Sequence, residues 1–224
     1  MNETTARLRI TRRSGKVRVV AAAGAALSVD GGAMEPTADG SYEIRAHKSS
    51  VLEVHCPAGS DLTISTVSGG IEVLGEAGSV KVTTKSGKVS VERAAAIDAR
   101  GNSGRVKVGV CTGECHIAFV SSDVHIGEAG RVVGATVSGD IEVDEVDDAE
   151  VKTVSGQIEL GARGGGRLAA RSISGTVKIS VPKGDLPATS LSSVSGRVRC
   201  DCGQGNHGEI RAKTISGTIS VKCR

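Results

Sequence analysis

The chain has 224 residues, a formal net charge of +3 and 38% hydrophobic residues, a balance typical of a folded protein and not of a disordered one. No stretch is long and apolar enough to cross a bilayer, and the N-terminal residues lack the apolar core of a signal peptide. Tyr42 and Phe119 are the only aromatic residues. Their scarcity argues against one large globular core and against stacking platforms for nucleic acids or sugars.

These properties set the expected location and the expected partners. Six cysteines without an export signal indicate reduced thiols, so we expect a cytoplasmic protein, with association with the cell envelope as the alternative. We expect neither a membrane span nor nucleic-acid binding, because the net charge is small and stacking residues are missing.

Residues 1–60 are the least regular part of the chain. The phrase SGKVRV begins at Ser14, and the next copy of the same pattern begins 54 residues further on, at Ser68. This distance is three times eighteen residues, so the segment fits either an N-terminal β cap or a set of degenerate coils. We place the regular repeats in residues 61–224.

From residue 61 onward, the phrase Ser-Gly-x-(Ile/Val)-x-(Val/Ile) recurs every 17–21 residues. Its copies begin at Ser68, Ser86, Ser103, Ser121, Ser138, Ser155, Ser174, Ser195 and Ser216. A period near twenty residues is typical of a stack of small structural units, each of which buries its apolar face against its neighbours.

Within each repeat, apolar and polar residues alternate. The third residue after the serine is always Ile or Val, as at Ile141 and Ile158, and a small hydroxyl residue usually lies two positions before the serine, as at Thr136 and Thr153. This period of two predicts half-buried strands on both sides of a Ser-Gly bend. The predicted fold is therefore all-β: a parallel β-solenoid, a single-stranded and right-handed β-helix with coils of 17–21 residues and an N-terminal cap.

The residue immediately before the repeat serine is apolar in most copies. Strict alternation points it away from the core, which predicts an exposed apolar row of the kind found at interfaces. Alternatively, the Ser-Gly bend rotates these side chains inward. The candidate interface residues are Val67, Val120, Val137, Val154, Ile173, Val194 and Ile215.

The sequence stops three residues after Val221, the last core position of the final repeat. The end of a solenoid is an open sheet edge that must be capped, charged or paired. Lys213, Lys222 and Arg224 could blunt this edge, or it could pair with another copy, so we expect a possible homo-oligomer through the C-terminal solenoid edge.

The cysteines offer two candidate sites. Cys202 and Cys223 each lie seven residues after a repeat serine, which stacks them on neighbouring coils as a disulfide or, as expected in a reducing compartment, as two thiols. Cys111, Cys115 and His116 form a C-x-x-x-C-H cluster that lacks the second ligand pair of a zinc site. We predict no metal there.

We interpret His125 and the acidic segment 140–150 as solvent-exposed surface. His125 falls on an outward ladder beside Glu142, and the segment 140–150 holds seven carboxylates without the spacing of a calcium loop. The repeat serines are explained by the bend, so no nucleophile–base arrangement can be argued. We therefore predict no catalytic residues, no cofactor and no metal ion.

The run VHCPAGSDLTISTVSG, which begins at Val54, combines a valine, a proline, a small residue and a glycine with a strand, the letters TVSG and a second strand. This pattern, which continues to the C-terminus, resembles the bacterial putative-adhesin family, domain of unknown function 4097. The resemblance implies solenoidal β-structure at cell envelopes, a role in adhesion and no catalytic residues.

These features together favour a non-catalytic binding or scaffold module that mediates protein–protein or envelope-associated interactions. One alternative is a self-assembling structural polymer like the bactofilins, which also stack β-coils. A third reading is a carbohydrate-active β-helix enzyme, although the outward ladders show no convergent cluster of acids and bases.

Overall fold

The computed structural model describes residues 5–46 and 51–224, and every regular element in this part of the chain is a β-strand. Its fourteen strands form one sheet in mostly parallel order. They are β1 (Arg7–Arg12), β2 (Lys16–Ala22), β3 (Ser28–Asp30), β4 (Gly32–Pro36), β5 (Tyr42–Ala46), β6 (Val51–Pro57), β7 (Asp61–Ser68), β8 (Ile71–Ser138), β9 (Ile141–Ser155), β10 (Ile158–Ala162), β11 (Arg167–Val181), β12 (Ala188–Ser195), β13 (Val198–Cys200) and β14 (Glu209–Cys223). The predicted all-β class is confirmed, and the parallel order is that of a β-solenoid-like fold; its handedness stays a prediction.

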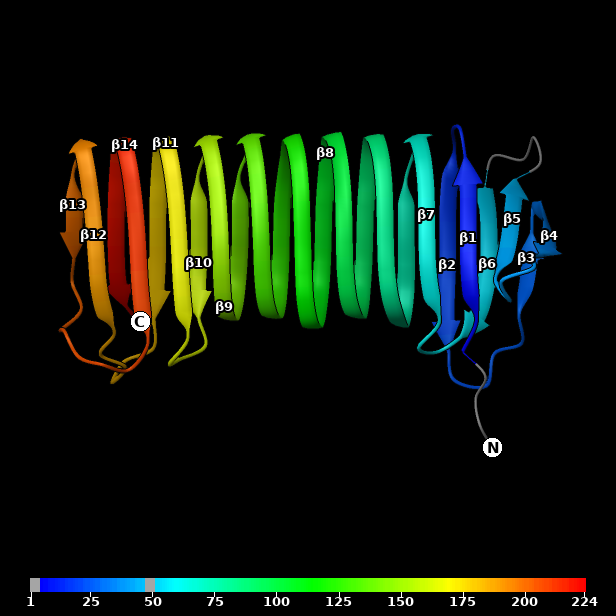
Figure 1. The fold of residues 1–224 in the computed structure, drawn as a ribbon, viewed down its shortest axis with the longest axis horizontal. Helices are drawn as coiled ribbons and strands as arrows, with labels where there is room; N and C mark the ends of the chain where they lie inside the picture. Colours follow the sequence, from blue (N-terminus) through cyan, green and yellow to red (C-terminus); the bar gives the residue numbers. More distant parts are fainter. Residues whose placement is uncertain (1–4, 47–50) are drawn as a thin grey trace. The chain divides into compact units, whose positions relative to one another are not determined.

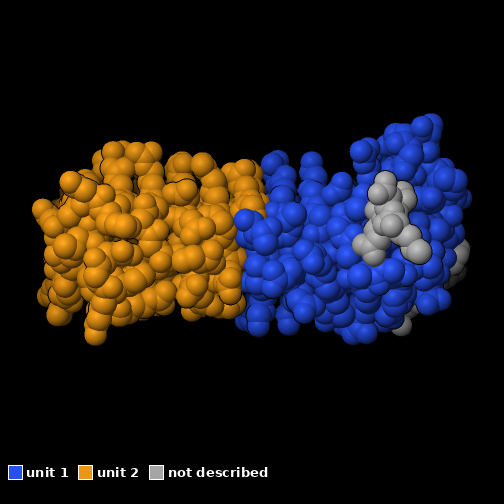
Figure 2. Space-filling model, turned by 90° about the horizontal axis from the view of Figure 1, so that it is seen from below, with its two compact units in different colours: residues 1–112 blue, residues 113–224 orange. Residues whose placement is uncertain are grey.

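The chain divides into two compact units, residues 1–112 and 113–224, which are coloured separately in Figure 2. The division that we expected near residue 60 stays a prediction. No helix in the described part of the chain could span a membrane. We describe the two units in turn.

In the unit 1–112, the first coil lies inside the sheet and not at its edge. β1 pairs in parallel with β5 on one side and β7 on the other, and β2 lies between β6 and β8 in the same way. The antiparallel strands β3 and β4 pair with β6 and β5. β3 and β4 lie between the Ser14 and Ser68 copies of the repeat. The 54 residues between these copies therefore include antiparallel strands, which the later coils lack.

In the unit 113–224, the coils stack in register (Figure 1). Ile158 pairs with Ile141 on β9 and with Val177 on β11, and Val177 pairs in turn with Ile219 on β14. All four side chains are at most 1% exposed. The inward positions of the repeat therefore form a continuous aliphatic ladder, which explains why this fold needs so few aromatic residues.

The Ser-Gly pair makes the bend that the repeat predicts. Gly156 has a φ of +136°, and a Cβ atom at this position would lie 2.2 Å from the carbonyl oxygen of Gly139 on the neighbouring coil. Only glycine fits a backbone this close to its neighbour. Beside the bend, Thr136 Oγ1 donates a hydrogen bond to Thr153 Oγ1 at 3.2 Å, so the buried hydroxyl row continues from coil to coil.

The end of the sheet differs from the expected one. β14 lies between β11 and β12, because Ala212 on β14 pairs with Ala170 on β11 and with Leu191 on β12. The open edge in this unit is therefore formed by β12 and β13 and not by the last strand of the chain. The expectation that the last strand of the chain forms this edge was wrong, because the final repeat inserts before the penultimate one. A homo-oligomer through the C-terminal solenoid edge stays a prediction.

Candidate functional site

The apolar residues before the repeat serines are exposed. Val137, Val154, Ile173 and Ile215 are 46%, 41%, 47% and 52% accessible, whereas their chain neighbour Thr153 is 5% accessible. The Ser-Gly bend therefore does not rotate them into the core. Val67 in the first unit is also exposed, at 46%.

The exposed residues of the second unit form a continuous line across coils. The residues on either side of Ile173 pair with those flanking Val154 on β9 and with those flanking Ile215 on β14. Adjacent parallel strands lie about 4.8 Å apart, so the side chains are close neighbours. We name this set the apolar row: Val120, Val137, Val154, Ile173, Ile215 and Val194.

Two grooves adjoin the apolar row in the second unit. The first has a volume of about 420 Å³, and Ile173, Ile215 and Val194 line it together with Lys152, Arg171 and Lys213. The second has a volume of about 530 Å³, and its cationic lining residues are Arg131, Arg167, Arg171, Arg211 and Lys213. The two grooves share Arg171 and Lys213, which are paired residues of β11 and β14.

Most charges around these grooves are already neutralised. Lys152 Nζ lies 2.7 Å from Glu150 Oε1, and its hydrogen bond lowers the pKa of that carboxyl group. Arg167 contacts Glu209 at 2.9 Å and lowers the pKa of Glu209 in the same way.

Arg171 and Lys213 differ from these neighbours. Neither makes an ion pair within the described residues. Two adjacent cations repel each other when stacked directly across a sheet, and Glu150 is the carboxylate on which Arg171 acts through space.

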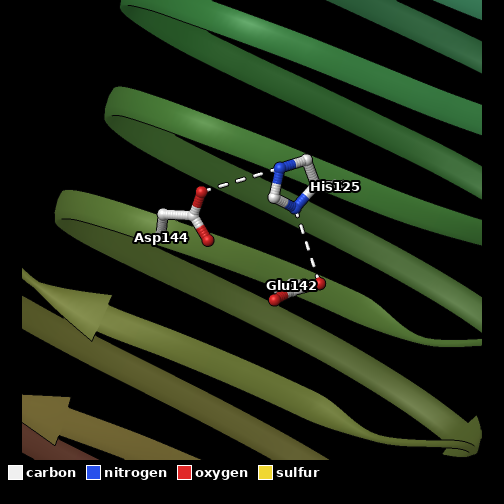
Figure 3. Close-up of side chains that lie close together, drawn as sticks. All are labelled: His125, Glu142 and Asp144. Atoms are coloured by element: carbon white, nitrogen blue, oxygen red, sulfur yellow. Dashed lines mark ion pairs between the residues drawn. The ribbon is translucent and has the colours of Figure 1, made fainter.

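A second cluster brings a histidine between two carboxylates (Figure 3). His125 Nδ1 lies 3.5 Å from Glu142 Oε2, and His125 Nε2 lies 3.6 Å from Asp144 Oδ2. His125 on β8 pairs in register with Glu142 on β9, and Asp144 follows two positions later on the same outward face. One ligand atom from each residue lies within 4.8 Å of the other two.

The repeat, the parallel register and the antiparallel strands β3 and β4 can be compared with known proteins. The sequence model of the Toastrack DUF4097 family matches residues 2–222. The chain belongs to the Toastrack DUF4097 family. The sequence resemblance to this family is therefore confirmed over more of the chain than the repeats from Val54 onward.

Two crystal structures are similar to this Toastrack chain. A putative adhesin from Bacteroides fragilis has 12% sequence identity and a TM-score of 0.48, with 99% of this chain and 94% of that chain covered. A putative cell adhesion protein from Clostridium sporogenes also has 12% identity, with a TM-score of 0.31 and coverage of 98% and 93%. No curated protein matches the sequence.

Among the described residues of this Toastrack chain, no cysteine lines either groove or belongs to the cluster at His125. Cys202 and Cys223 form a disulfide with a Cα–Cα distance of 5.5 Å, although thiols were the expected state. Cys111 and Cys115 are buried in the core. His116 directly follows Cys115 and is partly exposed, so strand alternation directs it to the opposite face. The C-x-x-x-C-H pattern therefore does not assemble its three residues on one face.

The carboxylates of the acidic segment 140–150 have different partners. Arg163 lies 3.6 Å from Glu145 and 3.5 Å from Asp147, while Asp140 and Asp148 accept hydrogen bonds from backbone N–H groups. Glu142 and Asp144 have no ion pair with Lys or Arg within the described residues; their partner is His125. Sequence reasoning placed His125 beside Glu142 but missed Asp144, which the i, i+2 spacing on one strand face could have identified.

Proposed function

We propose that this chain is a non-catalytic, right-handed β-solenoid binding module that holds a protein partner on the apolar row of residues 113–224. The observation that carries this proposal is the exposure of the row: five of its aliphatic side chains are 41–52% accessible and the sixth, Val194, is 81% accessible. Contiguous exposed aliphatic side chains are typical of interaction surfaces.

The energetic basis is the burial of these side chains by a partner. Complete burial of one Val or Ile side chain contributes about 1.5–3 kcal/mol relative to full exposure. The row is half-exposed, so each residue supplies a part of this value. Val154, Ile173 and Ile215 lie on strands that are paired on both sides, so ordering this part of the surface costs little conformational entropy on binding.

Charge complementarity indicates the chemistry of the partner. Arg171 and Lys213 have no ion-pair partner within the described residues and lie beside Ile173 and Ile215 in the same groove. A protein segment that presents carboxylates next to aliphatic side chains fits both features. A concave groove suits such a segment better than the flat surface of a bilayer, and the scarcity of aromatic residues disfavours nucleic acid.

We place this binding in an oxidising compartment, in association with the cell envelope. The disulfide between Cys202 and Cys223 supports this location, because disulfides persist in secreted and envelope-facing proteins and are rare in a reducing cytoplasm. This location is the one that the family resemblance implied, and it differs from the cytoplasmic location that was expected first.

The experiment compares the intact chain with two triple variants. Partners captured by the intact chain from its native organism are purified, and their affinity is measured for Val137→Ser/Val154→Ser/Ile173→Ser. We expect the affinity to fall at least tenfold. The matched control, Lys107→Ser/Glu159→Ser/Lys178→Ser, changes three outward strand positions away from the row and is expected to bind as the intact chain does. The proposal would be refuted if the row variant bound every captured partner with the same affinity as the intact chain.

A self-assembling polymer is the second candidate, and the open edge of the second unit favours it. Val198 on β13 occupies a core position of its repeat but is 42% exposed, and the strand pairs with β14 alone. Light scattering over a concentration series distinguishes the two functions. A monomer at every concentration would exclude the polymer function, whereas assemblies that grow with concentration would support it.

A further inference from the structure

We propose that His125, Glu142 and Asp144 form a binding site for a divalent transition-metal ion of the Zn²⁺ class. The site lies away from the apolar row, and its occupation does not depend on the proposed partner binding. The argument uses the position of three ligands on two paired strands, the donor chemistry, and the charges that surround them.

The backbone holds the three side chains on one outward face. His125 and Glu142 are registered partners on β8 and β9, and Asp144 is two residues from Glu142. Residues two apart on a strand project to the same side. All three side chains are 38–55% exposed, so an ion can reach them from solvent without any opening of the fold.

The donor set selects a class of ion. One imidazole nitrogen and two carboxylate oxygens suit Zn²⁺ and its neighbours among the transition metals, whereas Ca²⁺ and Mg²⁺ prefer an all-oxygen shell. Metal–ligand bonds of about 2.0–2.2 Å place tetrahedral ligands about 3.4 Å apart. The three ligand atoms lie within 4.8 Å of one another. Rotations of these exposed side chains that shorten the separations by up to about 1.4 Å complete the site, with water at the remaining position.

The electrostatic environment favours a cation. Glu142 and Asp144 carry two negative charges that no Lys or Arg neutralises within the described residues, and their neighbour Asp140 adds another carboxylate. A neutral imidazole leaves these charges uncompensated. A divalent ion bound by the imidazole and both carboxylates balances them.

Two other histidines of the described residues provide natural comparisons. His55 lies 3.7 Å from Glu53, and His207 lies 3.9 Å from Asp185; each faces a single carboxylate. A metal ion that needs three protein ligands should therefore distinguish His125 from His55, although both are partly exposed and both contact an acidic residue.

Titration of the full chain with ZnCl₂ tests the site. Calorimetry and NMR of the histidine rings are recorded in a Cys200→Ser background, because Cys200 is an exposed free thiol that binds zinc itself. We expect one saturable event that perturbs the His125 ring. The isosteric variant Asp144→Asn and the variant His125→Asn should each lower the affinity at least tenfold, while His55→Asn should leave it unchanged.

Two results would overturn the proposal. In the first, no saturable binding occurs at millimolar Zn²⁺, which leaves the cluster as a contact between a histidine and two carboxylates. In the second, Asp144→Asn and His125→Asn bind as tightly as the unchanged chain, which places the ion elsewhere. Circular dichroism of each variant verifies that the strands remain folded, and the isosteric Asp144→Asn change keeps the test valid if a histidine variant unfolds.

Discussion

Cys202 and Cys223 are joined across two neighbouring coils, with Cα atoms 5.5 Å apart and 21 residues of sequence separation. The bond connects the edge coil, which contains β12 and β13, to the coil of β14. Closing a loop of this length stabilises the folded chain by about 3 kcal/mol in the loop-entropy account. We expect Cys223→Ser to raise hydrogen exchange in residues 188–200, with little change in β9.

The matched control is Cys200→Ser, which changes an exposed free thiol on the same coil. It should leave the exchange of residues 188–200 as in the unchanged chain. If Cys223→Ser exchanges no faster than this control, the disulfide does not hold the edge coil.

The bend glycines should tolerate no side chain. Gly156→Ala forces a Cβ to within 2.2 Å of the Gly139 carbonyl oxygen at a φ of +136°, and we expect a loss of about 2–4 kcal/mol in the free energy of unfolding. Gly134→Ala is the control, because a Cβ there meets its neighbours at 3.5–3.7 Å. Denaturant unfolding of both variants measures the difference, and equal stability would contradict the close approach at the bend.

Two isoleucines on adjacent coils should separate folding from binding. Ile158 is fully buried in the core ladder, and Ile173 is 47% exposed in the apolar row. Ile158→Ala is expected to cost about 2–5 kcal/mol through the cavity that it leaves, and Ile173→Ala less than about 0.5 kcal/mol. Guanidinium unfolding reports both values. A large loss of stability in Ile173→Ala would show that the row supports the fold.

Glu72 should titrate below its ordinary range. Hydrogen bonds from Lys16 at 2.7 Å and Arg18 at 3.1 Å lower its pKa from the ordinary 4.5. Because the pKa is lower in the folded chain, this carboxylate stabilises the fold above about pH 4.5, and the stabilisation is lost as the pH falls through the folded value. Carbon NMR of the Glu72 carboxyl group should show the pKa rising in Lys16→Met and not in the control Lys81→Met.

The core ladder could be predicted from the sequence, because burial on one face of a strand requires an apolar residue at every second position. Ile141 and Ile158 therefore occupy the core, and Val154 and Ile173 the surface, as alternation indicates. The His125–Glu142 contact follows from the same repeat register. These features depend only on spacing within a coil or between consecutive coils.

The order of the coils at the ends could not be predicted in this way. Val177, Val198 and Ile219 occupy equivalent positions in their repeats, so the backbone of β14 can pair in register with β11, with β13 or with both. The repeat fixes which residues pair but not which coil lies next to which. The Asp144 contact was missed for another reason: it lies diagonally across the strands from His125, outside the straight ladder.

The insertion of β14 between β11 and β12 affects how the chain acquires its structure during synthesis. β12 leaves the ribosome before β14, yet its sheet partner is β14 alone. While residues 209–223 are still to be made, β11 therefore presents a free edge to an early-made strand with the same repeat pattern. The nascent chain must keep these two strands apart, or separate them again, before the last strand can enter. Completion of the fold thus waits for the final segment to be translated, and a pause before that segment favours mispaired coils.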